Sequence, residues 1–101
     1  MTPEELYTAL AGTGIPTAYR AFPAPQATPF ICYYVEEEPA LPADGIRYYS
    51  WKRFVIELYT DSKDTAKEAI VEAALGDRVF SKAETYIDEE KMTEIIYTME
   101  G

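Results

Sequence analysis

Two short runs of carboxylates are the side chains best suited to chemistry, Glu36-Glu37-Glu38 and Asp88-Glu89-Glu90. Paired carboxylates can act as general acid and base, or bind a hard cation through several oxygens. Both runs stand at the ends of predicted strands, where neighbouring side chains point to opposite faces and do not converge. The second run also lacks the ligand spacing of a calcium-binding loop. We therefore interpret both runs as solvated strand ends and predict no catalytic residue and no metal site.

The chain offers few other residues that could catalyse a reaction, because it has no histidine and one cysteine, Cys32. Without histidine, the commonest general base and every Ser/His/Asp or Cys/His set are missing. Cys32 lies in an apolar run and has no neighbouring cation to lower its pKa, so we predict a small buried residue in a reducing compartment rather than a reactive thiol. The sequence predicts no enzyme, no cofactor and no small-molecule substrate.

Length and composition describe one folded, acidic domain. The 101 residues are 48% hydrophobic and 14% aromatic, with a net charge of −9. This chain is too apolar to be a disordered acidic tail, and its length predicts a single domain over residues 1–101. The negative charge argues against tight nucleic-acid binding and against adsorption to an anionic membrane. We find no targeting signal and no apolar run long enough to span a bilayer.

Helix caps and strand alternation predict an α+β domain. Thr2-Pro3-Glu4-Glu5 is a capping box that starts one helix, and Asp64 caps a second helix that ends at Gly76. The order α-β-β-β-α-β-β indicates a mainly antiparallel sheet with two helices packed on one face. The predicted strands cover residues 15–22, an edge strand because of Pro16, and then 29–36, 47–59, 79–87 and 92–99.

The second helix carries a face of small residues that we expect to pack on the sheet. Its charged residues Lys63, Lys67, Glu68 and Glu72 fall outside that face. The small-residue face consists of Ala66, Ala69, Ile70, Ala73 and Ala74.

The third predicted strand, residues 47–59, is too long for a chain of this size. It would span about 43 Å, against a diameter of roughly 33 Å for a compact domain of this length. Its first half carries Tyr48, Tyr49 and Trp51, aromatic types that are enriched at binding hot spots. The strand is therefore bulged, or its first half is a projecting arm that needs a partner surface.

The acidic residues avoid this long strand and the second helix. Residues 1–46 hold six acidic side chains and one basic, residues 47–75 hold five of each, and residues 76–101 hold seven acidic and three basic. This distribution indicates a neutral, tyrosine-rich surface for a protein partner and a separate negative surface.

Four short segments resemble a family of small prophage proteins. These are Ile-Pro-x-Ala-Tyr at 15–19, Pro-Phe-Ile-Cys-Tyr-Tyr at 29–34, Ile-Glu-Leu-Tyr-Thr-Asp at 56–61, and Glu-Thr-Tyr-Ile at 84–87 before Met92. The family is that of tail-completion or tail-terminator proteins of long-tailed bacteriophages. The resemblance implies an α+β subunit that assembles as a ring, commonly a hexamer, at the head–tail junction of the virion, with the host cytoplasm as its location before assembly. Its partners would be other copies of itself, the tail-tube protein and the head connector proteins.

A ring subunit needs a neighbour contact and a channel that does not hold DNA. We expect the Tyr48, Tyr49 and Trp51 arm, together with loop residues Leu41 and Ile46, to contact the next subunit. Glu36, Glu37 and Glu38 are the candidates for an acidic lumen that repels phosphate.

A second function class also fits the acidic composition. A soluble decoy that mimics DNA could inhibit a nucleic-acid-binding protein of the host. This alternative predicts carboxylates at regular intervals along one face, whereas the sequence clusters them at strand ends and turns.

Overall fold

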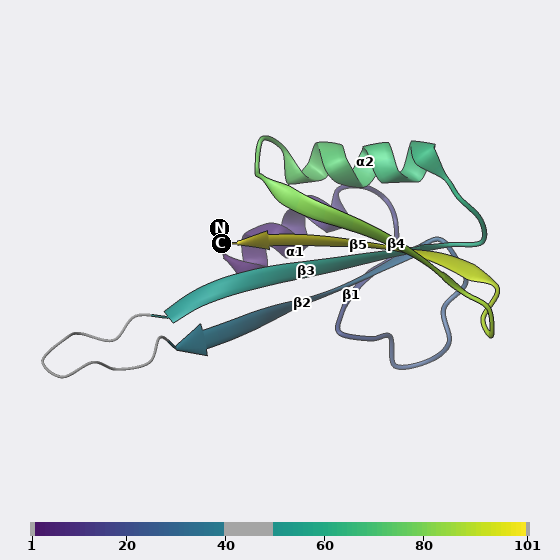
Figure 1. Ribbon diagram of the computed structural model, residues 1–101, viewed down its shortest axis with the longest axis horizontal. Helices are drawn as coiled ribbons and strands as arrows, with labels where there is room; N and C mark the ends of the chain where they lie inside the picture. The colour runs from purple at the N-terminus through teal and green to yellow at the C-terminus, as the bar shows by residue number, and fades with distance from the viewer. Residues whose placement is uncertain (1, 40–49, 101) are drawn as a thin grey trace, which may run out of the picture.

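The computed structural model describes residues 2–39 and 50–100, with backbone only at 37–39, 50 and 51 (Figure 1). Its elements are α1 (Pro3–Ala11), β1 (Thr17–Tyr19), β2 (Phe30–Pro39), β3 (Ser50–Thr60), α2 (Thr65–Leu75), β4 (Phe80–Ile87) and β5 (Met92–Glu100). The predicted order and the α+β class are confirmed.

The five strands form one sheet in the order β1-β2-β3-β5-β4. β1 pairs with β2 in parallel, and the remaining pairs are antiparallel. β1 is the predicted edge strand, but it is shorter than expected because Arg20 takes a positive φ of 66° and turns the chain away from the sheet. β3 lies at the centre, between β2 and the last strand of the chain.

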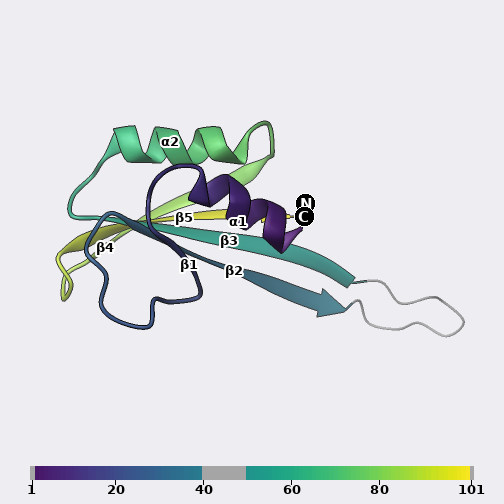
Figure 2. The same cartoon turned by 180° about the vertical axis from the view of Figure 1, so that it is seen from behind.

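Both helices lie on the same side of the sheet (Figures 1 and 2). Strand alternation sends every second side chain toward them, and we call this side the helix-covered face. The other side carries no helix, and we call it the open face. The core between the helices and the sheet consists of Leu6, Leu10, Ile15, Ile31, Tyr33, Phe54, Ile56, Leu58, Val71, Leu75, Ile95, Tyr97 and Met99.

The helix termini form as the sequence predicts. The Thr2 hydroxyl accepts a hydrogen bond from Glu5 N–H at 3.1 Å, and the Glu5 carboxylate accepts one from Thr2 N–H at 2.9 Å. At α2, Asp64 Oδ1 accepts from Lys67 N–H at 3.1 Å, and Gly76 follows the last turn with φ +69°. These caps satisfy N–H groups that have no partner within the helix.

The predicted packing face of α2 is wrong. The buried residues of this helix are Glu68, Val71 and Leu75, while Ile70 in the small-residue face is 39% exposed. Ala66, Ala69 and Ala73 are also exposed. Val71 and Leu75 decide which face of α2 packs on the sheet, because each buries more apolar surface than an alanine does.

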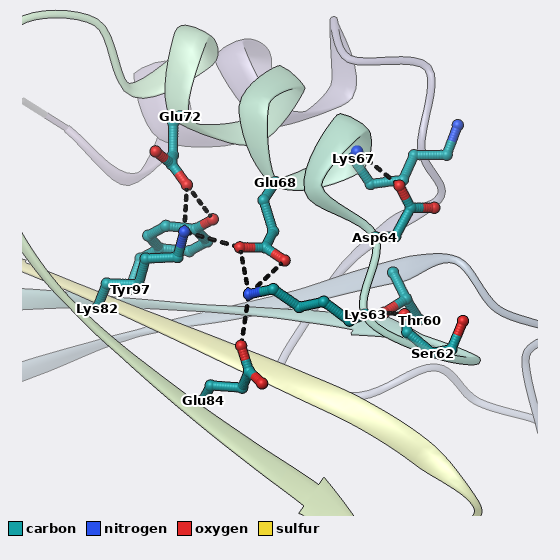
Figure 3. A network of polar contacts seen from close by, with 10 residues as sticks. All are labelled: Thr60, Ser62, Lys63, Asp64, Lys67, Glu68, Glu72, Lys82, Glu84 and Tyr97. Atoms are coloured by element: carbon teal, nitrogen blue, oxygen red, sulfur yellow. Dashed lines mark hydrogen bonds and ion pairs between the residues drawn. The ribbon is translucent and has the colours of Figure 1, made fainter.

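Glu68 can be buried at this position because two lysines neutralise it (Figure 3). Lys82 Nζ lies 2.7 Å from Glu68 Oε1, and Lys63 Nζ lies 3.0 Å from Oε2. Glu72 extends the network, since its Oε2 lies 2.8 Å from Lys82 Nζ and accepts the Tyr97 hydroxyl at 2.8 Å. The network ties α2 to β4 and β5.

The two lysines also set the titration of Glu68. Burial raises the pKa of this carboxyl, but the hydrogen bonds and charges of Lys82 and Lys63 outweigh it and leave the pKa below 4.5. A carboxyl with a lowered pKa stabilises the fold above its unfolded pKa, and this contribution disappears as the pH falls through its folded pKa.

We predict that Lys82→Met destabilises the protein by about 2 kcal/mol at pH 7, because one partner of a buried carboxylate is lost while Lys63 remains. Urea unfolding monitored by circular dichroism measures this, and the difference from wild type should shrink below pH 4.5, where Glu68 becomes protonated. Lys67→Met on the same helix is the control. Equal losses in both variants would contradict the role of Lys82.

Candidate interaction surfaces

The described residues contain no metal cluster and no membrane helix. No group of three or more Cys, Asp or Glu side chains within residues 2–39 and 50–100 could hold a metal ion. Neither α1 nor α2 is long and apolar enough to cross a bilayer. The candidate sites are therefore surfaces, and three of them stand out.

The first surface is the projecting end of the β2–β3 hairpin, which we call the ribbon (residues 37–39 and 50–52). β5 pairs with β3 only from Arg53 to Thr60, whereas β2 continues to pair up to Pro39 opposite Ser50. In the described part of the chain, the ribbon therefore has two strands and no third (Figure 1). Two strands alone are marginal in water, so this end gains stability from any surface that covers it.

The predicted interface residues are only partly within the described structure. Trp51 lies in the ribbon, where its backbone pairs with Glu38. Tyr48, Tyr49, Leu41 and Ile46 fall within residues 40–49, outside the described residues. Their contact with a neighbouring subunit stays a prediction.

The acidic run at the base of the ribbon faces basic residues across the ladder. Glu36 lies opposite Arg53, and Glu36 Oε2 is 3.4 Å from an Arg53 guanidinium nitrogen. Glu37 pairs with Lys52 in the same register. Strand alternation places Glu36 on the open face. Their role in a channel stays a prediction.

The second surface is the open face of the sheet, where aromatic and apolar side chains lie beside charged and polar ones. Phe30 and Tyr59 stack with ring centroids 4.7 Å apart. Phe22, in the proline-rich loop after β1, packs edge-on against Phe30 at 5.6 Å. This loop borders a cavity of about 640 Å³, whose floor includes Phe30, Cys32 and Tyr59. Cys32 is buried as predicted, at 5% exposure, but on the open face rather than in the helix-covered core.

Two carboxyl groups share this open face, a feature that the sequence did not reveal. Glu57 of β3 and Glu94 of β5 interact directly, and the Tyr59 hydroxyl donates to Glu94 Oε2 at 2.9 Å. Burial, followed by the hydrogen bond and negative charge of Glu94, raises the pKa of Glu57 to about 7. Burial also raises the pKa of Tyr59. The pair arises from the register between β3 and β5, and a carboxylate between Ile56 and Leu58 was the one local signal.

The third surface is a tyrosine-lined groove between α1 and the β1 edge. Tyr33 is 7% exposed, and the half-exposed rings of Tyr7 and Tyr19 lie 6.1 and 5.3 Å from it. The groove has a volume of about 650 Å³ and reaches Lys52 at the ribbon. The groove therefore adjoins the ribbon at Lys52.

Comparison with known proteins identifies the fold. No protein-family model and no curated protein matches the chain. Among solved structures, it is similar to a chain of "Virion of native gene transfer agent (GTA) particle", with 20% sequence identity and a TM-score of 0.64. The match covers 94% of this chain and 88% of that chain. At this identity the likeness shows a shared fold over nearly the full length.

We predict that Glu57→Gln stabilises the protein by about 1 kcal/mol at pH 8 and changes little at pH 4, where Glu57 is already protonated. The Glu57 carboxyl has a pKa raised from 4.5 to about 7, so it does not lower the free energy of unfolding below pH 4.5. The free energy of unfolding falls as the pH rises through about 7 and the buried carboxyl becomes charged. Thermal unfolding across this pH range measures the effect. Glu100→Gln, on an exposed residue of the same sheet, is the control. A pH-independent difference would contradict the carboxyl pair.

Proposed function

We propose that the chain is a structural protein of a phage or phage-like virion, a tail terminator or another head–tail joining subunit that assembles as a ring on the tail tube. The observation that carries this proposal is the full-length similarity of its fold to a chain of a gene transfer agent virion. The motifs at 15–19, 29–34, 56–61 and 84–87 resemble those of tail-completion proteins and favour the same class.

The geometry is consistent with a ring subunit. A sheet backed by two helices presents a ribbon at one end, where the described backbone of β2 and β3 pairs without a third strand. Burying aromatic anchors in a neighbour is the usual source of interface energy. We propose that Tyr48, Tyr49 and Trp51, with Leu41 and Ile46, supply that contact.

The charge of the chain suits a channel through which DNA moves. Each copy brings a net charge of −9, so a ring would repel phosphate rather than bind it. Glu36, Glu37 and Glu38 remain our candidates for the lumen. The pairing of Glu36 with Arg53 and of Glu37 with Lys52 argues against an uninterrupted acidic face such as a DNA mimic would need.

We predict that Tyr48→Ala/Trp51→Ala leaves the subunit folded but prevents ring assembly. Truncating two interface aromatics typically costs at least about 2 kcal/mol at each contact, and a ring repeats the loss at every interface. Electron microscopy of particles from a phage carrying the variant should show tails that are not joined to heads. Circular dichroism of the isolated protein tests folding.

Ile70→Ala is the control, because Ile70 is 39% exposed and lies on α2, outside the ribbon. Normal joined particles from the double variant would contradict the role of the arm. A pull-down separates the two function classes. Capture of tail-tube protein supports head–tail joining, and capture of a basic DNA-binding enzyme alone would favour the decoy.

A further inference from the structure

β4 is an edge strand that the rest of the described structure leaves uncovered on one side. Within residues 2–39 and 50–100, it pairs only with β5, from Phe80 opposite Met99 to Ile87 opposite Met92. Most of its residues are exposed, Tyr86 is 55% exposed, and Val79 just before the strand is 90% exposed. A strand edge of this length with exposed apolar neighbours is a template for pairing with another chain.

The hydrogen-bonding direction of β4 follows from the other edge of the sheet. Ile31 N–H donates to the Pro16 carbonyl and the Tyr33 carbonyl accepts from Arg20 N–H, so odd-numbered β2 residues point toward β1. The antiparallel registers of β2 with β3, β3 with β5 and β5 with β4 then fix which β4 residues direct their backbone groups toward β5. The β4 residues whose N–H and C=O groups point away from β5 are Phe80, Lys82, Glu84 and Tyr86.

The sequence around β4 is a chemical palindrome centred on Ala83. Lys82 is mirrored by Glu84, and Ser81 by Thr85. Phe80 is mirrored by Tyr86, and Val79 by Ile87, in the segment Val-Phe-Ser-Lys-Ala-Glu-Thr-Tyr-Ile. Opposite charges, hydroxyl pairs and aromatic pairs are the combinations that stabilise directly opposed residues in antiparallel strands.

We propose that β4 pairs antiparallel with β4 of a second copy of this chain, with Ala83 on the two-fold axis. In this register Lys82 lies opposite Glu84 of the second copy, and Phe80 lies opposite Tyr86 of the second copy. Both pairs use the outward-pointing backbone groups, so their N–H and C=O groups bond to each other. The interface is isologous, because the same strand serves both sides.

In this dimer the helix-covered faces of the two sheets lie on the same side. All four outward-pointing residues of β4 carry their side chains on the helix-covered face, as the registers with β5 require. Directly opposed residues of an antiparallel pair share a face, so the helices of both copies lie on one side of a continuous sheet. The side chains of Phe80 and Tyr86 from both copies then lie on this same side of the sheet.

The charged residues of β4 could instead serve to block edge pairing, as lysines often do. Lys82 is held toward α2 by Glu68 and Glu72, and Glu84 is held by Lys63 (Figure 3). Each charge is therefore already balanced within its own copy, so neither blocks the edge of β4. The ribbon is formed by β2 and β3, which β5 separates from β4 in the sheet. Pairing through β4 therefore leaves the ribbon available for ring contacts.

Cysteine crosslinking tests the two-fold register directly. Opposed Ala83 residues form a non-hydrogen-bonded pair with Cα atoms about 4.5 Å apart, a separation that a disulfide can bridge. Ala83→Cys should give a covalent dimer under mild oxidation. Ser81→Cys alone should not, because the two Ser81 positions of the dimer lie about 13 Å apart along the strands. A mixture of Ser81→Cys and Thr85→Cys should crosslink, because these two positions lie opposite each other. Wild type controls for Cys32, which is buried.

A proline variant tests the backbone pairing. Glu84→Pro removes an N–H that points away from β5, and Glu84→Ala removes the same side chain but keeps the N–H. Sedimentation should give wild type and Glu84→Ala twice the 11.4 kDa chain mass. Glu84→Pro should dimerise about tenfold more weakly or worse. Circular dichroism and melting temperature verify that both variants fold.

The outcomes are decisive for β4 and independent of the proposed virion function. A monomeric wild type, or Ala83→Cys that crosslinks no more than Ser81→Cys, would overturn the dimer. Equal dimerisation of Glu84→Pro and Glu84→Ala would also overturn it. Joined particles can form in either case, because ring assembly is measured in virions and depends on the ribbon rather than on β4.

Discussion

Two helices of nine and eleven residues have to cover a five-stranded sheet, and they reach only one face of it. This limit governs the rest of the structure. The covered face can be apolar and closely packed, with Leu6, Leu10, Val71 and Leu75 against the central strands. The open face has to remain compatible with water, and it does so by stacking Phe30 on Tyr59 and by placing Glu57 and Glu94 among apolar neighbours. The edges β1 and β4 and the ribbon are what remains for partners.

Local signals in the sequence were sufficient for the elements and their order. The capping box at Thr2 and the cap at Asp64 depend on residues three positions apart, so both helix starts could be read directly. Every second residue over 54–58 in β3 and over 95–99 in β5 is apolar in the sequence, and the six residues of this pattern are all buried: Phe54, Ile56, Leu58, Ile95, Tyr97 and Met99. The single domain, the ring and the interface residues remain predictions, because nothing described here tests them.

The features that sequence could not reveal depend on contacts between distant segments. The small-residue face of α2 was a plausible packing face, and Glu68 was a plausible exposed residue. The burial of Val71 and Leu75 reversed this, and Lys82 in β4 supplies the charge that makes a buried Glu68 acceptable. Similarly, Glu57 and Glu94 meet only because β3 pairs with β5 in a particular register. The direction of β1 relative to β2 is also set by tertiary pairing rather than by composition.

The position of β5 has a consequence for how the chain matures during synthesis. β5 is the last element of the chain, yet it lies between β3 and β4 and contributes Ile95, Tyr97 and Met99 to the core. Before it is made, β4 has no strand to pair with among the described elements, and α2 lacks its anchor at Tyr97. The sheet can therefore close only once β5 has left the ribosome, later than every other described element.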